Sequence, residues 1–147
     1  GLKKELDACG FQAALCANSR QLVWNKLFTN VSLSAVTGIL QVNIGYIGAS
    51  AHAWEMTEAL IHEGAAVARG LGLEADDEAI IKKVRDTSLM SPEGCTSIRA
   101  DLRDGRKTEV DTISGSVVRA AEKCGVPVPL HRFVVEMVHA MEERSGQ

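Results

Sequence analysis

Helical periodicity runs through nearly the whole of this 147-residue chain, and it constrains the fold more than any other feature. Apolar residues recur at three- and four-residue spacing among Ala, Leu, Glu and Arg, and no stretch of convincing length alternates as a β-strand does. Aromatic residues make up only 4% of the sequence. We therefore expect an all-α fold, a single multi-helix domain of six or seven helices.

Residues typical of helix ends divide this pattern into segments. Ser50 is placed to cap one helix, Gly125 to end another, and Pro129 to begin the last one. Thr108 and Asp111 have the spacing of a capping box, which predicts a helix that starts there. The predicted helices cover residues 21–37, a short piece of 39–47, 51–69, 76–87, 96–103, 108–123 and 129–143.

Composition excludes several classes of protein. A net charge of −3 and a pI near 5.8 argue against a nucleic-acid partner. No apolar run approaches the roughly 20 residues of a membrane span, and no N-terminal stretch reads as a secretory signal. The four cysteines are widely spaced without a CxxC pair, which predicts free thiols and a cytoplasmic protein: Cys9, Cys16, Cys95 and Cys124.

One polar stripe lies on the first long helix. Lys26, Asn30 and Ser34 are four residues apart, so they share a face, and Val23 falls within the same stripe. Apolar neighbours on both sides place this stripe inside the expected buried sector, where an ammonium group needs a partner or a cavity. A functional lysine and a lysine that snorkels at the edge of the core both remain open.

Two further groups of residues could carry chemistry. Ser97 starts a short amphipathic helix, and Glu109 stands near the start of the next one, where a first-turn acid also suits the helix dipole. Glu55, Glu58 and His62 share a helix face and could ligate a metal, but an exposed charged face is the usual explanation, because the ExxH spacing of carboxylate-bridged metal sites is missing. The glycines form no phosphate-binding loop, so we expect no dinucleotide site within this chain.

Several motifs in a fixed order resemble the C-terminal domain of the ketopantoate reductase (2-dehydropantoate 2-reductase) family. The resemblance covers nearly the whole chain. It rests on Trp24-x-Lys26-Leu27-x-x-Asn30, Thr96-Ser97-x-x-x-Asp101, Gly105-Arg106-x-Thr108-Glu109-Val110-Asp111-x-Ile113-x-Gly115, Val117-Val118 and Gly125-Val126-Pro127-x-Pro129.

The resemblance implies a domain organisation. It predicts a helical fold similar to the C-terminal domain of 6-phosphogluconate dehydrogenase. Residues 1–18 would be a linker helix and connection, with residues 2–9 as its helical tail, and 19–147 a substrate and dimerisation domain. The family's Rossmann domain, which binds most of the NADPH, would be absent, and the chain would form a homodimer.

The resemblance also implies roles for single residues. Lys26 would polarise the ketone and supply the proton, Asn30 would bind the substrate, and Ser97 would bind its carboxylate. Glu109 would hold Lys26 and substrate in register. Ser34 stands where the family commonly has asparagine, so it would bind substrate with less reach.

These implications define the functional hypotheses. The first is the substrate-binding half of an NADPH-dependent reductase that converts ketopantoate to pantoate for coenzyme A biosynthesis, inactive without its cofactor domain. Reduction of a related 2-oxo acid and a non-catalytic helical dimerisation or interaction module are the alternatives. A metal-binding bundle is a third possibility. The expected partners are a small 2-oxo acid, the Rossmann domain and a second copy.

Overall fold

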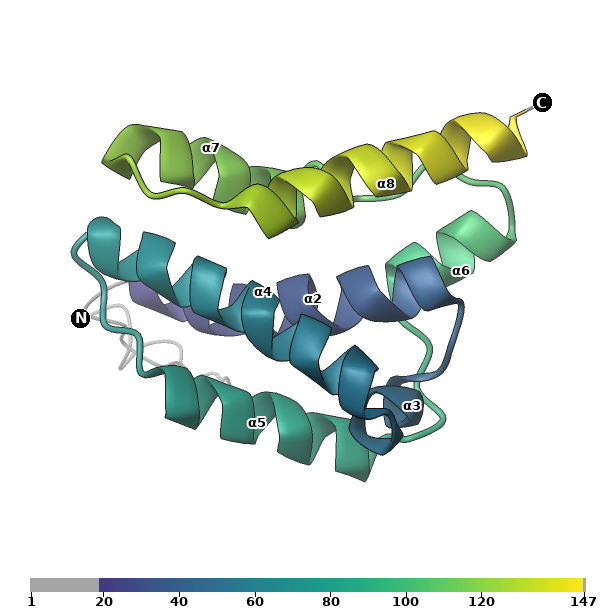
Figure 1. Cartoon of the computed structure of the whole chain (residues 1–147), viewed down its shortest axis with the longest axis horizontal. Helices are drawn as coiled ribbons and strands as arrows, with labels where there is room; N and C mark the ends of the chain where they lie inside the picture. The colour runs from purple at the N-terminus through teal and green to yellow at the C-terminus, as the bar shows by residue number, and fades with distance from the viewer. Residues whose placement is uncertain (1–18, 147) are drawn as a thin grey trace, which may run out of the picture.

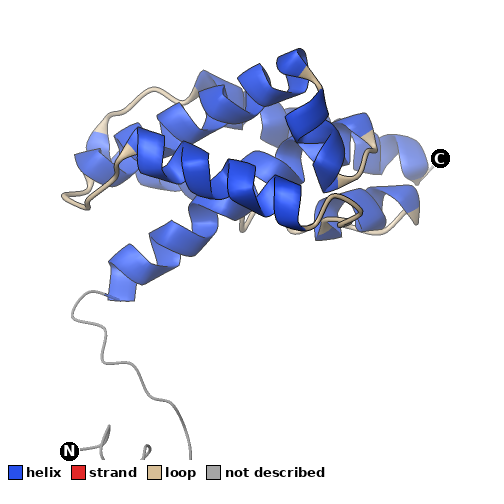
Figure 2. Ribbon diagram, turned by 90° about the horizontal axis from the view of Figure 1, so that it is seen from below, coloured by secondary structure: helices blue, strands red, loops and turns tan. Residues whose placement is uncertain are grey.

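The computed structural model describes residues 19–146, and within that range the chain is helical with no strand (Figure 1, Figure 2). The predicted all-α fold is therefore confirmed. Residues 1–18, which include the expected linker helix, lie outside the described range. The described helices are α2 (Ser19–Leu40), α3 (Ile44–Ala49), α4 (Ala51–Gly70), α5 (Asp77–Met90), α6 (Ser97–Arg103), α7 (Ser114–Cys124) and α8 (Pro129–Ser145).

Helix α2 forms the centre of the domain. It packs against α4, α5, α6 and α8, and every residue from 31 to 38 is buried. This stretch is apolar or small on all sides, as is typical of a helix enclosed by others. Two of its hydroxyl groups are satisfied within the helix, because Ser32 donates to the Phe28 carbonyl oxygen and Thr37 donates to that of Leu33. In Figure 1, α7 and α8 lie along one side of the α2–α4 pair and α5 lies along the other.

Most of the predicted helix ends are confirmed. The Ser50 side chain accepts a hydrogen bond from the Ala53 amide, and Asp76 caps α5 through the Ala79 amide. Gly125 follows α7 with a φ of 70°, a left-handed conformation that glycine adopts without steric cost. Pro129 is the first residue of α8, where its missing N–H is not needed.

The predicted capping box at Thr108 is wrong. Helix α7 begins at Ser114, and the backbone around Thr108–Ile113 forms turns. The Thr108 hydroxyl oxygen accepts from the Val110 amide, two residues on, which closes a local turn instead of a helix. Val110 and Ile113 are both buried, so tertiary packing holds this turn in place of a first helical turn.

No helix in the described range is both long enough and apolar enough to cross a membrane.

Candidate active-site face

The first turns of α2 extend away from the body of the domain (Figure 2). Lys26 and Asn30 lie on the exposed side of this extension, together with Leu22 and Val23, which are 59% and 64% exposed. Residues Trp24 and Phe28 on the opposite side are buried against the rest of the domain. The N-terminal half of α2 therefore has one covered side and one open side.

This arrangement corrects the helical-wheel prediction. The stripe of Lys26 and Asn30 does not lie in a buried sector, because in the described part of the chain nothing packs over it until about Val31. Ser32, on the side of the helix opposite this stripe, is fully buried. A wheel treats a helix as uniform along its length, whereas α2 is half-covered at one end and enclosed at the other.

Lys26 is exposed, so its ammonium group does not lie in the buried environment that the wheel predicts. Within residues 19–146 no hydrogen bond or ion pair involves its side chain, and Glu109 is not its partner. The amine is accessible to a small molecule at this face.

The three polar residues of the stripe descend from the surface into the domain. Asn30 is exposed one turn beyond Lys26, and Ser34, a further turn along, is only 6% exposed. Ser34 can therefore contact a ligand only at the deep end of the face.

Ser97 belongs to a different helix, α6, which packs against α2 beyond Ser34. It is the exposed first residue of α6, which crosses the C-terminal half of α2. A Cβ atom on Gly38 would come within 2.6 Å of the Ile98 side chain, so only glycine allows this approach. The hydroxyl oxygens of Thr37 and Thr96 are 2.7 Å apart and join the same two elements.

Glu109 is exposed on the turn that precedes α7. Thr112 of the same turn lines a hollow of about 340 Å³ together with Val23 and Leu27 of α2. The fold thus places Glu109 on a segment next to the open part of α2. Within the described range, no hydrogen bond or ion pair joins the side chains of the five predicted residues Lys26, Asn30, Ser34, Ser97 and Glu109.

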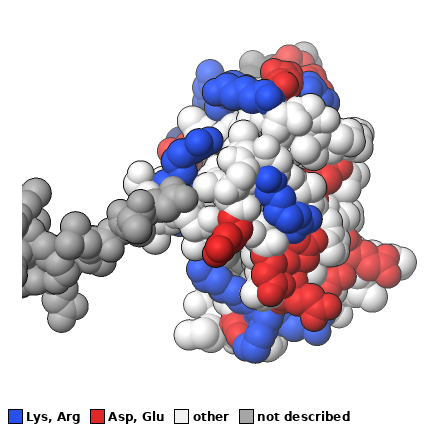
Figure 3. Space-filling model, turned by 90° about the vertical axis from the view of Figure 1, so that its left-hand side faces the viewer, with Lys and Arg blue, Asp and Glu red and all other residues white. Residues whose placement is uncertain are grey.

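The hollow between α2 and α7 has a basic lining that sequence reasoning missed. Arg20, Arg119 and Lys123 all contribute to it, and no acidic residue among those that the structure describes lines it. Arg20 is about 100 positions away from Arg119 and Lys123 in sequence, so only the tertiary structure brings it to them. Elsewhere on this end of the molecule, both signs of charge are interspersed (Figure 3). The local positive charge favours an anionic ligand beside the open face of α2.

A polar cluster behind α6 was also missed. Arg99 donates to the Asn43 side chain, Asn43 donates to Glu93 over 3.1 Å, and the Gln41 amide bonds the Gly38 carbonyl oxygen over 2.7 Å. Arg99, two residues after Ser97, thus joins α6 to the segment between α2 and α3. No short sequence motif contains these residues together.

The metal-site candidates have other partners. Glu58 accepts a hydrogen bond from the Trp54 indole, and His62 pairs with Asp77. Glu55 lies within 3.8 Å of His52 in an exposed pair. Across residues 19–146 no three His, Cys, Asp or Glu side chains are grouped so that they could hold a metal ion.

Comparison with known proteins identifies relatives of this chain. The family model "Ketopantoate reductase PanE/ApbA C terminal" matches residues 18–142. The 2-dehydropantoate 2-reductase of Streptococcus pyogenes serotype M1 is 34% identical over 138 residues, 93% of this chain and 45% of that protein. The enzyme of the same name from Archaeoglobus fulgidus is 30% identical over 137 residues, 93% of this chain and 46% of that protein.

Solved structures are similar over almost the entire chain. A D-mandelate dehydrogenase bound to NADH and anilino(oxo)acetate superimposes with a TM-score of 0.87 at 27% identity, covering 99% of this chain and 61% of that one. A PanE/ApbA family ketopantoate reductase from Ralstonia eutropha JMP134 gives 0.86 at 26% identity, covering 99% and 49%. The chain spans about half the length of the curated relatives it matches.

Proposed function

The chain belongs to the ketopantoate reductase C-terminal family, and from that premise we propose that it is the substrate-binding half of a nicotinamide-dependent 2-oxo-acid reductase. The preferred substrate is ketopantoate, reduced to pantoate, which supplies pantothenate and coenzyme A biosynthesis. We further propose a cytoplasmic homodimer.

One observation carries this proposal. Lys26 and Asn30 stand one turn apart on an open helix face, inside the segment that matches the family. An exposed ammonium group beside an amide can hold the two oxygens of a small 2-oxo acid. The basic hollow next to this face adds attraction for the substrate's carboxylate.

In the proposed mechanism the chain binds and polarises the ketone. Lys26 donates a hydrogen bond to the carbonyl oxygen, stabilises the negative charge that develops there and transfers a proton to that oxygen. Asn30, Ser34 and Ser97 orient the acid. Glu109 keeps Lys26 and substrate aligned from the neighbouring turn.

Within this chain, only the basic residues at one edge of the open face of α2 suit the nicotinamide cofactor. The chain has no glycine-rich phosphate loop, whereas Arg20, Arg119 and Lys123 offer positive charge at one edge of the face. When bound mainly by an adjoining nucleotide-binding domain, NADPH would supply the hydride to the carbonyl carbon. We accordingly propose that the described domain is inactive by itself.

A second substrate class has a specific observation in its favour. Ser34 replaces the asparagine common in the family, and a D-mandelate dehydrogenase is among the structural neighbours at 27% identity. Serine shortens the side chain at the deep end of the face and leaves room for a larger acid. A related 2-oxo acid with a bulkier side chain is therefore the alternative substrate.

The test is NADPH and NADH oxidation by the protein joined to its nucleotide-binding domain, with ketopantoate and a panel of 2-oxo acids. Lys26→Ala should lower kcat by roughly 100-fold or more. Lys82→Ala, which removes an exposed lysine of α5, is the control and should leave kcat unchanged. If Lys26→Ala keeps full turnover, the assigned mechanism is wrong, and if no 2-oxo acid is reduced, a non-catalytic interaction module replaces it.

A further inference from the structure

His139 of α8 lies between two carboxylates from different parts of the chain. Its Nδ1 is 2.9 Å from an oxygen of Glu142 on the same helix, and its Nε2 is 2.9 Å from Asp111 on the turn before α7. Carboxylate oxygens only accept hydrogen bonds, so both ring nitrogens must donate. Only the doubly protonated, positively charged imidazole satisfies both contacts.

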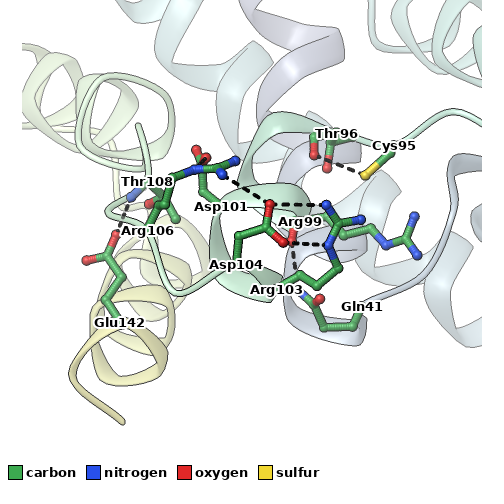
Figure 4. A network of polar contacts seen from close by, with 10 residues as sticks. All are labelled: Gln41, Cys95, Thr96, Arg99, Asp101, Arg103, Asp104, Arg106, Thr108 and Glu142. Atoms are coloured by element: carbon green, nitrogen blue, oxygen red, sulfur yellow. Dashed lines mark hydrogen bonds and ion pairs between the residues drawn. The ribbon is translucent and has the colours of Figure 1, made fainter. Parts of the chain in front are cut away.

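Besides His139, Glu142 has a second partner, which lies on the turn before α7. Its other oxygen accepts the Thr108 backbone N–H over 2.7 Å, a contact visible in Figure 4. The Glu142 side chain is 15% exposed, whereas His139 is 33% and Asp111 54% exposed, so water competes less for the contacts of Glu142 than for the contact at Asp111. His139 and Glu142 thus attach α8 to the turn at two positions, Thr108 and Asp111.

Glu109 stands between these two attachment points. Its side chain is exposed, and in the described residues no hydrogen bond or ion pair involves its carboxylate. The backbone around it forms turns, with Thr112 and Ile113 amides donating to the Glu109 carbonyl oxygen. The direction of the Glu109 carboxylate therefore depends on how firmly the turn is held from outside.

We propose that His139 and Glu142 are positioning residues, which clamp the turn at Thr108 and Asp111 and so aim Glu109 toward the open face of α2. The role of Glu109 in this inference rests on the proposed function. The clamp itself is a property of the fold and can be tested without turnover.

The clamp has a defined pH range. The hydrogen bonds that His139 donates to Glu142 and, second, to Asp111 raise the pKa of His139, so the ring stays charged above the pH at which a free histidine loses its proton. Burial acts to raise the pKa of Glu142, but the hydrogen bonds from the Thr108 amide and from His139 outweigh it. The pKa of Glu142 is therefore lowered. The clamp should hold at neutral pH and release as the pH rises through the pKa of His139.

Other charged groups near the ring are accounted for. Arg119, Arg132 and Glu136 line the adjoining hollow with Asp111, and Arg119 donates to the Asp111 carbonyl oxygen. Arg106, two residues before Thr108, pairs with Asp101 and Asp104 (Figure 4). These arginines do not occupy the carboxylate oxygens that His139 contacts.

The first experiment is amide hydrogen exchange on this chain at pH 7 and pH 9. His139→Gln and Glu142→Gln should each speed exchange of the Thr108–Thr112 amides at pH 7 by about three- to tenfold. In the unchanged protein the same amides should lose protection at pH 9 after correction for intrinsic exchange. His52→Gln and Glu143→Gln, exposed substitutions outside the clamp, are the matched controls. Unaltered protection in both clamp variants would overturn the proposal.

The second experiment links the clamp to Glu109 in the protein joined to its nucleotide-binding domain. His139→Gln should lower kcat about tenfold with little change in the KM for NADPH, and His139→Arg should restore it by keeping a permanent cation between the carboxylates. Restored activity should also persist to higher pH than in the unchanged protein. If exchange responds but kcat and its pH profile do not, the clamp stands and its link to Glu109 is wrong. If the unchanged protein reduces no 2-oxo acid, the proposed function fails while the exchange result is unaffected.

Discussion

Lys26 shows how a residue's environment differs from its sequence context. Its neighbours Leu22 and Val23 suggest burial, yet all three are exposed because α2 extends beyond the helices that cover it. The same lysine is therefore available for chemistry without any contribution to the core. A substitution at Lys26 should therefore lower activity without lowering the stability of the fold.

We expect Lys26→Ala to change the free energy of unfolding by less than about 0.5 kcal/mol, since the side chain is exposed and has no partner in the described residues. Urea denaturation of the isolated chain measures this directly. A decrease of more than about 1 kcal/mol in the free energy of unfolding would mean that Lys26 stabilises the fold. A loss of activity in Lys26→Ala could then not be attributed to a catalytic role.

The two histidines of α8 have opposite electrostatic environments. Burial lowers the pKa of His131, whose Nε2 donates to the Leu60 carbonyl oxygen over 3.0 Å, whereas two carboxylates raise that of His139. His131 is neutral when folded and takes up a proton on unfolding below about pH 6.5. Stability should therefore fall as the pH drops below that value because of His131, and fall as the pH rises above it because of His139.

His131→Gln should make the stability profile flatter on the acid side. Glutamine keeps a donor for the Leu60 carbonyl oxygen but does not titrate, so the loss of unfolding free energy between pH 7 and pH 5 should be smaller than in the unchanged protein. Urea denaturation at both pH values gives the comparison. His52→Gln, an exposed change, should retain the original slope, and an identical slope in His131→Gln would contradict this assignment.

At the level of elements, close contacts between backbones decide where the short helices sit. The Gly45 amide of α3 donates to the Pro92 carbonyl oxygen over 2.8 Å, and the Ile44 amide donates to that of Gly94 over 2.9 Å. A Cβ atom on Gly45 would lie 2.7–2.9 Å from three atoms of Pro92, two of them backbone. The α3 helix can approach the loop after α5 only because residue 45 has no side chain.

Gly45→Ala should lower the free energy of unfolding by about 1–3 kcal/mol, because backbone atoms of Pro92 cannot move aside without breaking these hydrogen bonds. Gly48→Ala in the same helix is the matched control. Its Cβ would be 3.3 Å from the Ser88 hydroxyl oxygen, and the gain in helix propensity should make it neutral or stabilising. Equal effects of both substitutions in thermal or urea denaturation would show that the Pro92 contact is not responsible.

For the whole molecule, the open face of α2 combines apolar and polar residues in a way that suits contact with another domain. Leu22 and Val23 stand beside Lys26 and Asn30, all exposed. The chain corresponds to about half of its curated relatives, so a nucleotide-binding domain is the proposed partner for this face.

Leu22→Asp should impair joining of the two halves. In the protein that contains both domains we expect the KM for NADPH to rise about tenfold and kcat to fall, because the substitution places a charge in a contact between apolar surfaces. The isolated helical domain should keep its melting temperature, since Leu22 is already 59% exposed. Leu89→Asp, at a 69% exposed leucine of α5, is the control and should change neither quantity. If Leu22→Asp has the same kcat and KM as the unchanged protein, the nucleotide-binding domain does not contact α2 at Leu22.

The local sequence determined the helices and most of their ends. Ser50, Asp76, Gly125 and Pro129 act within four residues of themselves through capping bonds or fixed backbone angles, so their effects can be predicted without knowing the fold. The motifs likewise placed the chain in its family. These signals depend on short-range chemistry.

The tertiary structure alone decided which faces are covered and which distant groups meet. It enclosed Ser32, left Lys26 open, and delayed α7 from Thr108 to Ser114 because packing of Val110 favours a turn. It also brought His139 to Asp111 and gathered the basic side chains of α2 and α7. Burial and long-range ion pairs depend on the relative placement of whole helices, which no pattern within one helix contains.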